Sequence, residues 1–224
     1  MTVLIVANGD PPSADCARAW RQQASMLIAA DGGLAHCLAW GMPPDLLIGD
    51  LDSVPPAAVD AMRQRGGLVQ DHPRRKQAND LELALQAVLT AGHERAVVLA
   101  GVGGRWDQSL ASFLLMAHEQ FASLQVELAD DRQWASLLRP GPGLTLPGAA
   151  GDTVSLLALT PTADGVTTAG LEYPLNKEQL ILGSSRGISN TIVSLPSTVE
   201  VERGLVLCLL GRAGDIPPVD QGGT

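Results

Sequence analysis

Two carboxylates one residue apart, Asp50 and Asp52, follow an aliphatic run in residues 48–53 (IGDLDS). In an extended segment alternate side chains point to the same side, so both acids can offer oxygen atoms to one ion. Carboxylate oxygens are ligands that Mg²⁺ prefers in proteins. The spacing therefore predicts a site for a metal-bound polyphosphate. The alternative is a short acidic turn ahead of a helix that begins at Pro55 and Pro56.

A glycine-rich segment, residues 101–108 (GVGGRWDQ), offers a second set of anion-binding groups. Its glycines allow backbone N–H groups to approach an anion, and the Arg105 guanidinium can bind phosphate in a bidentate manner. Asp107 can accept hydrogen bonds from a base, a sugar or an amine. The alternative is a tight turn in which Asp107 caps the following helix.

Two further acidic positions allow both a structural and a functional interpretation. Asp31, followed by Gly32 and Gly33, is placed either to cap a helix or to contact a ribose. Asn79 is a suitable helix cap, and Asp80 either complements the helix dipole or provides a third acid beside the first two. Sequence spacing leaves both alternatives open at each position.

The remaining polar residues limit the ways in which the chain could bind a metal ion or a nucleotide. In the basic run of residues 74–76 (RRK), which reads as a solvated turn, we assign phosphate neutralisation to Lys76 alone. The four histidines lack the spacing of metal ligands, and the chain has neither a P-loop nor a dinucleotide fingerprint. A nucleotide, if bound, must be held in another way.

The elements that position these groups follow a βαβ rhythm. We expect buried parallel strands at residues 3–7, 26–30, 46–48, 68–70, 96–100 and 125–128, and helices at 15–23, 34–40, 56–64, 80–90 and 108–123. This alternation predicts an α/β fold with a doubly wound, mainly parallel sheet. In such a sheet, ligands bind beyond the carboxyl ends of the strands, where the candidate residues fall.

The second part of the chain has a different character. Short apolar runs at residues 144–146, 154–159, 179–182, 188–195 and 205–210 alternate with Gly and Pro, which predicts a smaller all-β, sandwich-like domain. We therefore expect an α/β domain over residues 1–132, an all-β domain over 133–213 and a disordered tail over 214–224.

Composition excludes several classes of function. The formal net charge of -9 and the 3% aromatic content disfavour nucleic acid as a partner. No apolar run reaches the roughly 18 residues needed to span a bilayer, so we expect no membrane association. The three cysteines are widely spaced and form no CxxC pair, which favours a reducing, cytoplasmic setting.

Five segments, in this order, resemble thiamine pyrophosphokinase of the bacterial type: ADGG (30–33), GDLDS (49–53), NDLELAL (79–85), GGRWDQ (103–108) and GISN (187–190). The resemblance implies a homodimeric enzyme, with its active site near the subunit interface, that transfers the diphosphate of ATP to the hydroxyethyl group of thiamine. Thiamine diphosphate and AMP are then the products and Mg²⁺ the cofactor. The α/β domain would bind the nucleotide and catalyse transfer, and the all-β domain would bind thiamine and mediate dimerisation.

The same resemblance implies roles for individual residues. Asp50, Asp52 and Asp80 would bind the metal and, with Arg105, form the catalytic set; either Asp50 or Asp80 would accept the hydroxyl proton. The implied ATP-binding residues are Asp31, Gly32, Gly33, Ser53, Lys76, Asn79, Arg105, Asp107 and Gln108.

In the β half, Tyr173 would stack on the pyrimidine of thiamine, and Ser189 and Asn190 would hydrogen-bond it. One position departs from the family, which commonly has an acid where this chain has Gln77. That departure leaves open a non-catalytic relative that binds thiamine or thiamine diphosphate. A pyrophosphokinase for another alcohol, such as a pterin, is the third alternative.

Overall fold

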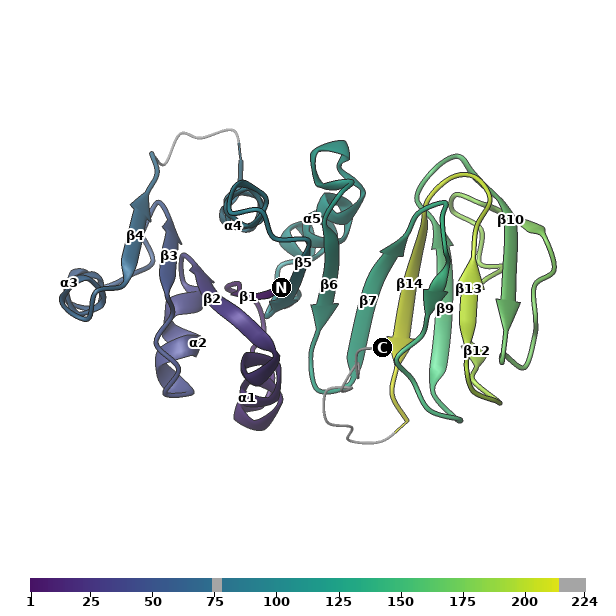
Figure 1. Cartoon of the computed structure of the whole chain (residues 1–224), viewed down its shortest axis with the longest axis horizontal. Helices are drawn as coiled ribbons and strands as arrows, with labels where there is room; N and C mark the ends of the chain where they lie inside the picture. The colour runs from purple at the N-terminus through teal and green to yellow at the C-terminus, as the bar shows by residue number, and fades with distance from the viewer. Residues whose placement is uncertain (74–77, 214–224) are drawn as a thin grey trace. The chain divides into compact units, whose positions relative to one another are not determined.

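The computed structural model of this chain describes residues 1–73 and 78–213 (Figure 1). The chain divides into two compact units, Met1–Asp130 and Asp131–Thr224. The sequence-based boundary was set after residue 132. Three predictions fall outside the described residues: the roles of Lys76 and Gln77, and the disorder of the tail over residues 214–224.

The N-terminal unit is built on a parallel sheet. Its strands are β1 (Thr2–Val6), β2 (Ala24–Ala30), β3 (Leu46–Gly49), β4 (Leu68–Asp71), β5 (Arg95–Leu99) and β6 (Gln125–Ala129). They lie in the order β6-β5-β1-β2-β3-β4, each parallel to its neighbours. The order reverses between β1 and β5, which makes this pair the topological switch point where open α/β sheets bind ligands.

Helices cover both faces of this sheet, as the predicted doubly wound fold requires (Figure 1). The helices are α1 (Ala14–Gln23), α2 (Gly33–Ala39), α3 (Pro56–Gln64), α4 (Asp80–Thr90) and α5 (Trp106–Ala117), followed by a 3₁₀ turn at Glu119–Phe121. Side chains of α1, α2 and α3 share one core cluster with β1, β2, β3 and β5. Helix α4 packs on β2 and β3.

The predicted helix over residues 108–123 is wrong at both ends. It starts at Trp106 and stops at Ala117, because His118 adopts an extended conformation (φ -63°, ψ 133°). The His118 side chain then accepts a hydrogen bond from the Gln120 backbone N–H and begins the separate 3₁₀ turn. A residue that caps a new turn cannot continue the helix before it.

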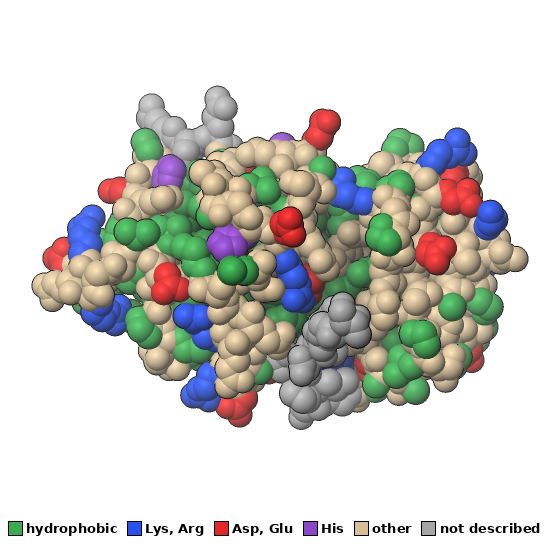
Figure 2. Space-filling view, viewed as in Figure 1, with side chains coloured by type: hydrophobic (Ala, Val, Ile, Leu, Met, Phe, Trp, Pro, Cys, Tyr) green, Lys and Arg blue, Asp and Glu red, His purple; other side chains and the backbone are tan. Residues whose placement is uncertain are grey.

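A cavity of about 390 Å³ lies beside α4 in this unit. It is lined largely by aliphatic side chains of β2, β3, β4 and α4: Met26, Leu46, Ile48, Leu68, Leu83 and Ala87. Figure 2 shows hydrophobic side chains between charged ones on one face of the N-terminal unit. Nothing in the described residues indicates what covers the cavity.

The C-terminal unit is all β, which confirms the predicted smaller all-β domain (Figure 1). One set of strands contains β7 (Gln133–Leu138), β9 (Thr153–Ala158), β12 (Asn190–Thr191) and β14 (Val206–Gly211), and the other contains β8 (Leu144–Thr145), β10 (Thr162–Ala169), β11 (Glu178–Ile181) and β13 (Thr198–Glu200). The pairs within each set are antiparallel. Alternating burial along β9 leaves one face on the core.

Two sequence predictions fail in this unit. The strand expected over residues 188–195 shrinks to β12. The positive φ of Ser189 (62°) interrupts the extended run before Asn190, and Ile192 makes only an isolated bridge with Leu171. Strands β7, β10 and β13 were not predicted. Polar residues dominate β10 and β13, and β10 also contains Gly165 (φ 69°), where the register with β11 shifts. Within the described residues, no helix combines the length and apolar character needed to cross a membrane.

Candidate active site at the carboxyl ends of the parallel strands

A cavity of about 430 Å³ lies at the carboxyl ends of the parallel strands, within the N-terminal unit. The residues that line it come from the loops after β1, β2, β3 and β5 and from the first turns of α4 and α5: Asn8, Gly9, Asp10, Asp31, Ser53, Asn79, Asp80, Gly101, Gly103, Gly104, Arg105, Gln108, Ser109 and Ser112. The cavity includes the loops of the switch-point strands β1 and β5. Chain topology therefore brings together most of the predicted nucleotide-binding residues.

The loops after β1 and β5 hold each other in place through their backbones. The Gly9 N–H donates to the Ala100 carbonyl oxygen (2.7 Å), and the Asp10 N–H donates to the Val102 carbonyl oxygen (2.8 Å). A Cβ atom at Gly9 would lie 2.3 Å from the Val102 oxygen, so this close approach requires glycine. Two walls of the cavity thus form one hydrogen-bonded structure.

Gly32 and Gly33 act in packing rather than as cavity lining. A Cβ at Gly33 would lie 2.1 Å from the Val6 carbonyl oxygen, so glycine lets the start of α2 approach β1. The N-cap residue of α2 is Gly32, and no side chain caps this helix. Helix capping by Asp31, one of the two alternatives for this residue, is therefore wrong.

Asp31 itself is buried at the cavity wall, with only 6% of its surface exposed. Its backbone adopts φ 45°, a region that Asp and Asn tolerate better than most residues. Burial raises the pKa of the Asp31 carboxyl group; hydrogen bonds with the Ser53 hydroxyl and the Gly32 backbone lower it, and the charges of Asp80 and Asp50 raise it further. An acid in this setting favours a proton or a cation.

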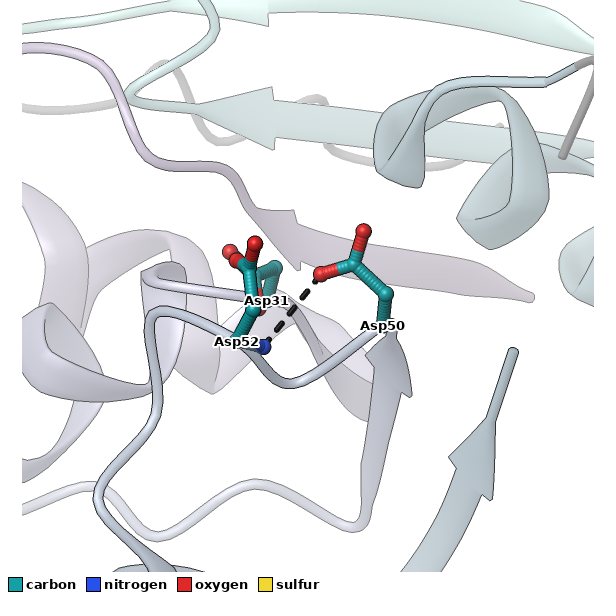
Figure 3. Close-up of side chains that lie close together, drawn as sticks. All are labelled: Asp31, Asp50 and Asp52. Carbon is teal, nitrogen blue, oxygen red and sulfur yellow. Dashed lines mark hydrogen bonds between the residues drawn. The ribbon is translucent and has the colours of Figure 1, made fainter. Parts of the chain in front are cut away.

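Asp31, Asp50 and Asp52 bring carboxylate oxygens within 4.8 Å of one another (Figure 3). The Asp52 N–H donates to Asp50 Oδ1 (3.3 Å), and the Ser53 hydroxyl donates to Asp52 Oδ1 (3.1 Å). Leu51, between the two acids, has a positive φ of 59°, so the segment turns instead of staying extended as the sequence suggested. The oxygen donors suit a hard divalent cation.

Asp80 lies beside this cluster at the start of α4. A Cβ at Gly49 would lie 3.0 Å from Asp80 Oδ1 and 3.0 Å from the Asp31 Cβ. Asn79 caps the helix, because its Oδ1 accepts a hydrogen bond from the Glu82 N–H (2.8 Å). The structural interpretation of Asn79 is thereby confirmed, although the residue also lines the cavity.

Arg105, which lines the cavity, forms an exposed ion pair with Asp107. The Arg105 guanidinium donates to both Asp107 oxygens, with Nε–Oδ1 and Nη2–Oδ2 distances of 3.2 and 2.6 Å. This hydrogen bonding lowers the pKa of Asp107 and raises that of Arg105. The N-cap of α5 is Arg105 without a side-chain bond, so Asp107 is not the cap. Arg105 and Gln108 line the cavity, whereas Asp107 does not.

The predicted thiamine-binding residues lie in the C-terminal unit. Tyr173 exposes 65% of its surface. The Asn190 side chain makes two hydrogen bonds with the Tyr173 backbone. Its Oδ1 accepts from the Tyr173 N–H (3.0 Å), and its Nδ2 donates to the Tyr173 carbonyl oxygen (2.7 Å). The Ser189 N–H donates to the Ser155 hydroxyl (3.1 Å). The structure thus gives Asn190 a role in fixing Tyr173.

Sequence reasoning assigned no role to four polar residues of the cavity: Asn8, Asp10, Ser109 and Ser112. The position of residues 8–10 directly after the first strand was the signal for the first two. The serines lie on α5, where Ser109 Oγ bonds both the N–H (3.0 Å) and the carbonyl (3.1 Å) of Gly103 and so shapes the glycine loop.

A doubly wound sheet with a glycine loop and an acidic cluster at its switch point, followed by an antiparallel β unit, defines a class of two-domain α/β enzymes that handle metal-bound phosphates. Comparison with known families identifies the member. The catalytic domain of thiamin pyrophosphokinase matches residues 17–128, and the vitamin B1 binding domain of the same enzyme matches residues 144–206. The chain belongs to the thiamin pyrophosphokinase family, which forms thiamine diphosphate from thiamine by diphosphate transfer.

Individual relatives agree with this membership. The thiamine pyrophosphokinase of Bacillus subtilis (strain 168) is 23% identical over 208 residues, which cover 93% of this chain and 97% of the relative. A crystal structure of thiamine pyrophosphokinase from Bacillus subtilis superimposes with a TM-score of 0.82 at 21% identity, covering 96% of this chain and 100% of the other. The thiamin pyrophosphokinase from Candida albicans gives a TM-score of 0.78 at 18% identity, over 94% and 88% of the two chains. The fold is therefore shared across these proteins.

Proposed function

We propose that the cavity at the β1/β5 switch point binds ATP with Mg²⁺ and transfers its β,γ-diphosphate to the hydroxyethyl oxygen of thiamine. The observation that carries this proposal is the convergence of Asp31, Asp80 and Arg105 in one cavity, beside Asp50 and Asp52. Acids that bind a cation and an arginine that binds phosphate are the groups needed for phosphoryl transfer.

Mg²⁺ would be held by Asp50, Asp52 and Asp80. It would neutralise charge on the transferred phosphates and polarise the β-phosphorus. The Arg105 guanidinium now forms a bidentate pair with Asp107. The same N–H groups could donate to phosphate oxygens, and because the pair is exposed, Arg105 can exchange one partner for the other. Gly101 and Gly104 line the same space, where glycine allows the backbone to approach an anion, whereas the Gly103 N–H donates to the Ser109 hydroxyl.

The transfer step is a displacement at the β-phosphorus. The thiamine oxygen forms a bond to this phosphorus, the bond from the β-phosphorus to the α–β bridging oxygen breaks, and AMP leaves with the electron pair. The thiamine hydroxyl proton passes to Asp50 or Asp80. Gln108, which lines the cavity, would lie near ATP and the thiamine hydroxyl, whereas Asp107, outside the lining, would act through its pair with Arg105.

The thiamine side of the site is proposed to use Tyr173, Ser189 and Asn190. The exposed ring of Tyr173 supports stacking on a pyrimidine, since a buried ring would be unavailable to a ligand. Because the Asn190 amide is engaged with the Tyr173 backbone, we propose that it acts on thiamine mainly by holding that ring. Ser189 remains the candidate for direct hydrogen bonding.

We propose that two copies associate, with the active site near their interface. Helix α5 begins directly after Arg105 and exposes three apolar side chains at intervals of four residues: Trp106, Leu110 and Leu114. Residues at this spacing share one helix face, which is typical of a contact surface.

Sedimentation equilibrium should give twice the chain mass for wild type, and Leu110→Glu should shift the measured mass toward that of the monomer. A wild-type protein that sediments as a monomer would contradict this proposal.

The test of function is a direct assay with purified protein, ATP, MgCl₂ and thiamine, in which AMP and thiamine diphosphate are separated by chromatography. We expect equal, thiamine-dependent formation of both. Calorimetric binding of thiamine without AMP release would instead favour the non-catalytic relative, and a pterin alcohol outcompeting thiamine as acceptor would favour the third alternative.

We also propose a reducing, cytoplasmic location, supported by three buried cysteines without a disulfide.

A further inference from the structure

Asp31 is the most unusual carboxylate in the described part of the chain. It is 6% exposed, and its Oδ1 has no hydrogen-bond partner there. A buried carboxylate oxygen without a partner is costly, because it has lost its hydration and gained nothing in exchange. Such an atom needs a reason to persist.

The usual structural reasons do not apply to Asp31. Helix α2 is capped at Gly32 without a side-chain bond, so Asp31 does not satisfy the N–H groups of that helix. Among the described residues that line the cavity, Arg105 is the cation, and it is paired with Asp107. Within the same described part of the chain, the charged groups that act on Asp31 are Asp80 and Asp50, and both are acids.

The orientation of Asp31 points to a ligand. Its carboxylate lies with those of Asp50 and Asp52 in a group whose oxygens are within 4.8 Å of one another (Figure 3). One divalent cation with ligand distances of roughly 2.0–2.6 Å can reach oxygens at such separations. Asp80 borders the same space across Gly49. A divalent cation would satisfy the orphaned oxygen and offset the repulsion between all of these acids at once.

We propose that Asp31 is a direct ligand of the divalent cation, so that the metal site is anchored on the β2 loop as well as on the β3 loop. The proposal rests on the proposed metal-dependent function and extends it. The Mg²⁺ site would then be built from the ends of two neighbouring parallel strands. Buried Asp31 would supply a rigidly held ligand on the protein side of the metal ion, whereas exposed Asp52 would supply a ligand on the solvent side.

The experiment measures binding of Mn²⁺ to the full chain without ATP or thiamine, by the EPR signal of free Mn²⁺. We compare wild type with Asp31→Asn, which has the same shape, no charge and a tolerance for the positive φ of this position. The matched control is Asp60→Asn, which removes an exposed acid of α3 in the same unit. Because loss of an outer-shell partner already weakens metal binding by roughly 10–100-fold, we expect Asp31→Asn to lose at least about tenfold and Asp60→Asn to match wild type.

A second readout separates a ligand from a nearby charge. Luminescence lifetimes of bound Eu³⁺ in H₂O and D₂O count its coordinated waters, and at saturating Eu³⁺ we expect Asp31→Asn to gain about one water. Thermal unfolding without metal should show Asp31→Asn at least as stable as wild type, because a buried carboxylate whose Oδ1 has no hydrogen-bond partner in the described residues has been replaced by a neutral amide.

Three outcomes would overturn the proposal: a loss of Mn²⁺ affinity below about tenfold in Asp31→Asn, an unchanged water count, or no detectable Mn²⁺ binding by wild type. Because neither ATP nor thiamine is present, these outcomes are independent of the transfer assay. Diphosphate transfer by wild type with an unchanged Asp31→Asn metal affinity would retain the proposed function and reject Asp31 as a ligand.

Discussion

Asp31 and Asp80 approach each other across a single glycine. A Cβ built on Gly49 would lie 3.0 Å from both the Asp31 Cβ and Asp80 Oδ1. The backbone of Gly49 also adopts φ 152°, which side-chain-bearing residues rarely occupy. The end of β3 is therefore the point at which the acids of β2, β3 and α4 are brought together.

Gly49→Ala should separate the acids as well as strain the backbone. We expect a loss of about 1–3 kcal/mol in the free energy of unfolding, together with weaker Mn²⁺ binding. Gly41→Ala is the matched control, because Gly41 also has a positive φ (69°) but nothing within 4 Å of its Cβ position. It should lose stability and keep metal affinity. Equal metal affinities in the two variants would show that Gly49 has no part in positioning the acids.

Asp52→Asn should abolish diphosphate transfer with little loss of fold, because Asp52 is exposed and contributes a metal-binding oxygen. The measurement is kcat/KM for thiamine at saturating ATP and MgCl₂, with thermal unfolding as the fold control. Activity within about tenfold of wild type corresponds to a loss of only ~1.4 kcal/mol of transition-state stabilisation, which would exclude a metal-binding role.

The fold was predictable where the hydrophobic pattern and the turn-forming residues indicate the same element boundaries. The buried strands β1 to β3 and β5 are continuous aliphatic runs, and α3 and α4 fall on the predicted residues 56–64 and 80–90. Strand β10 (TADGVTTA) was missed because its apolar alternation is broken by a bulge at Gly165, which only cross-strand pairing with β11 reveals. The early end of α5 depends on one backbone conformation, at His118, which composition does not encode.

The sequence predicted which residues lie together in the candidate site, but not what each of them contacts. The rule that sites follow parallel strands identified Asp31, Asp50 and Arg105 as neighbours in space. It did not distinguish a cap from a ligand, since that depends on φ and on burial: Asn79 caps α4, whereas Asp31 caps nothing. It also did not reveal that the Asn190 amide is already occupied by the Tyr173 backbone, because this contact joins residues 17 apart.

Arg105→Ala should lower kcat without changing stability. The Arg105–Asp107 pair is exposed, and pairs of this kind contribute little to folding. Since a single preorganised donor to a developing anion is worth about 10²–10³ in rate, we expect a loss of at least about a hundredfold in kcat. Arg18→Ala, which breaks an exposed Arg–Asp pair on α1, should leave kcat unchanged. A similar kcat for Arg105→Ala and wild type would remove Arg105 from the transfer step.

The buried thiols should be inert in the folded protein. Burial raises the pKa of both Cys37 and Cys208 from 9.0 to about 12, so at pH 8 both stay protonated and unreactive. The unfolded chain loses these protons first as pH rises above 9.0, so the stabilising contribution is complete below that pH and is lost between 9.0 and about 12. Titration with DTNB should label neither thiol at pH 8 until denaturant is added. Labelling of either thiol in native buffer would contradict the burial.

Asn190 should control thiamine binding through Tyr173. If the ring of Tyr173 stacks on thiamine, Tyr173→Ala removes the contact, and Asn190→Ala frees the backbone that carries it. Both variants should raise the KM for thiamine much more than the KM for ATP. Asn190→Asp keeps an acceptor for the Tyr173 N–H but loses the donor to its carbonyl, so its thiamine KM should be intermediate. Ser155→Ala, which removes the hydroxyl that accepts the Ser189 N–H, tests the neighbouring turn. Equal rises in both KM values for Tyr173→Ala would place thiamine elsewhere, and a normal thiamine KM for Asn190→Ala would show that the two hydrogen bonds do not hold the ring.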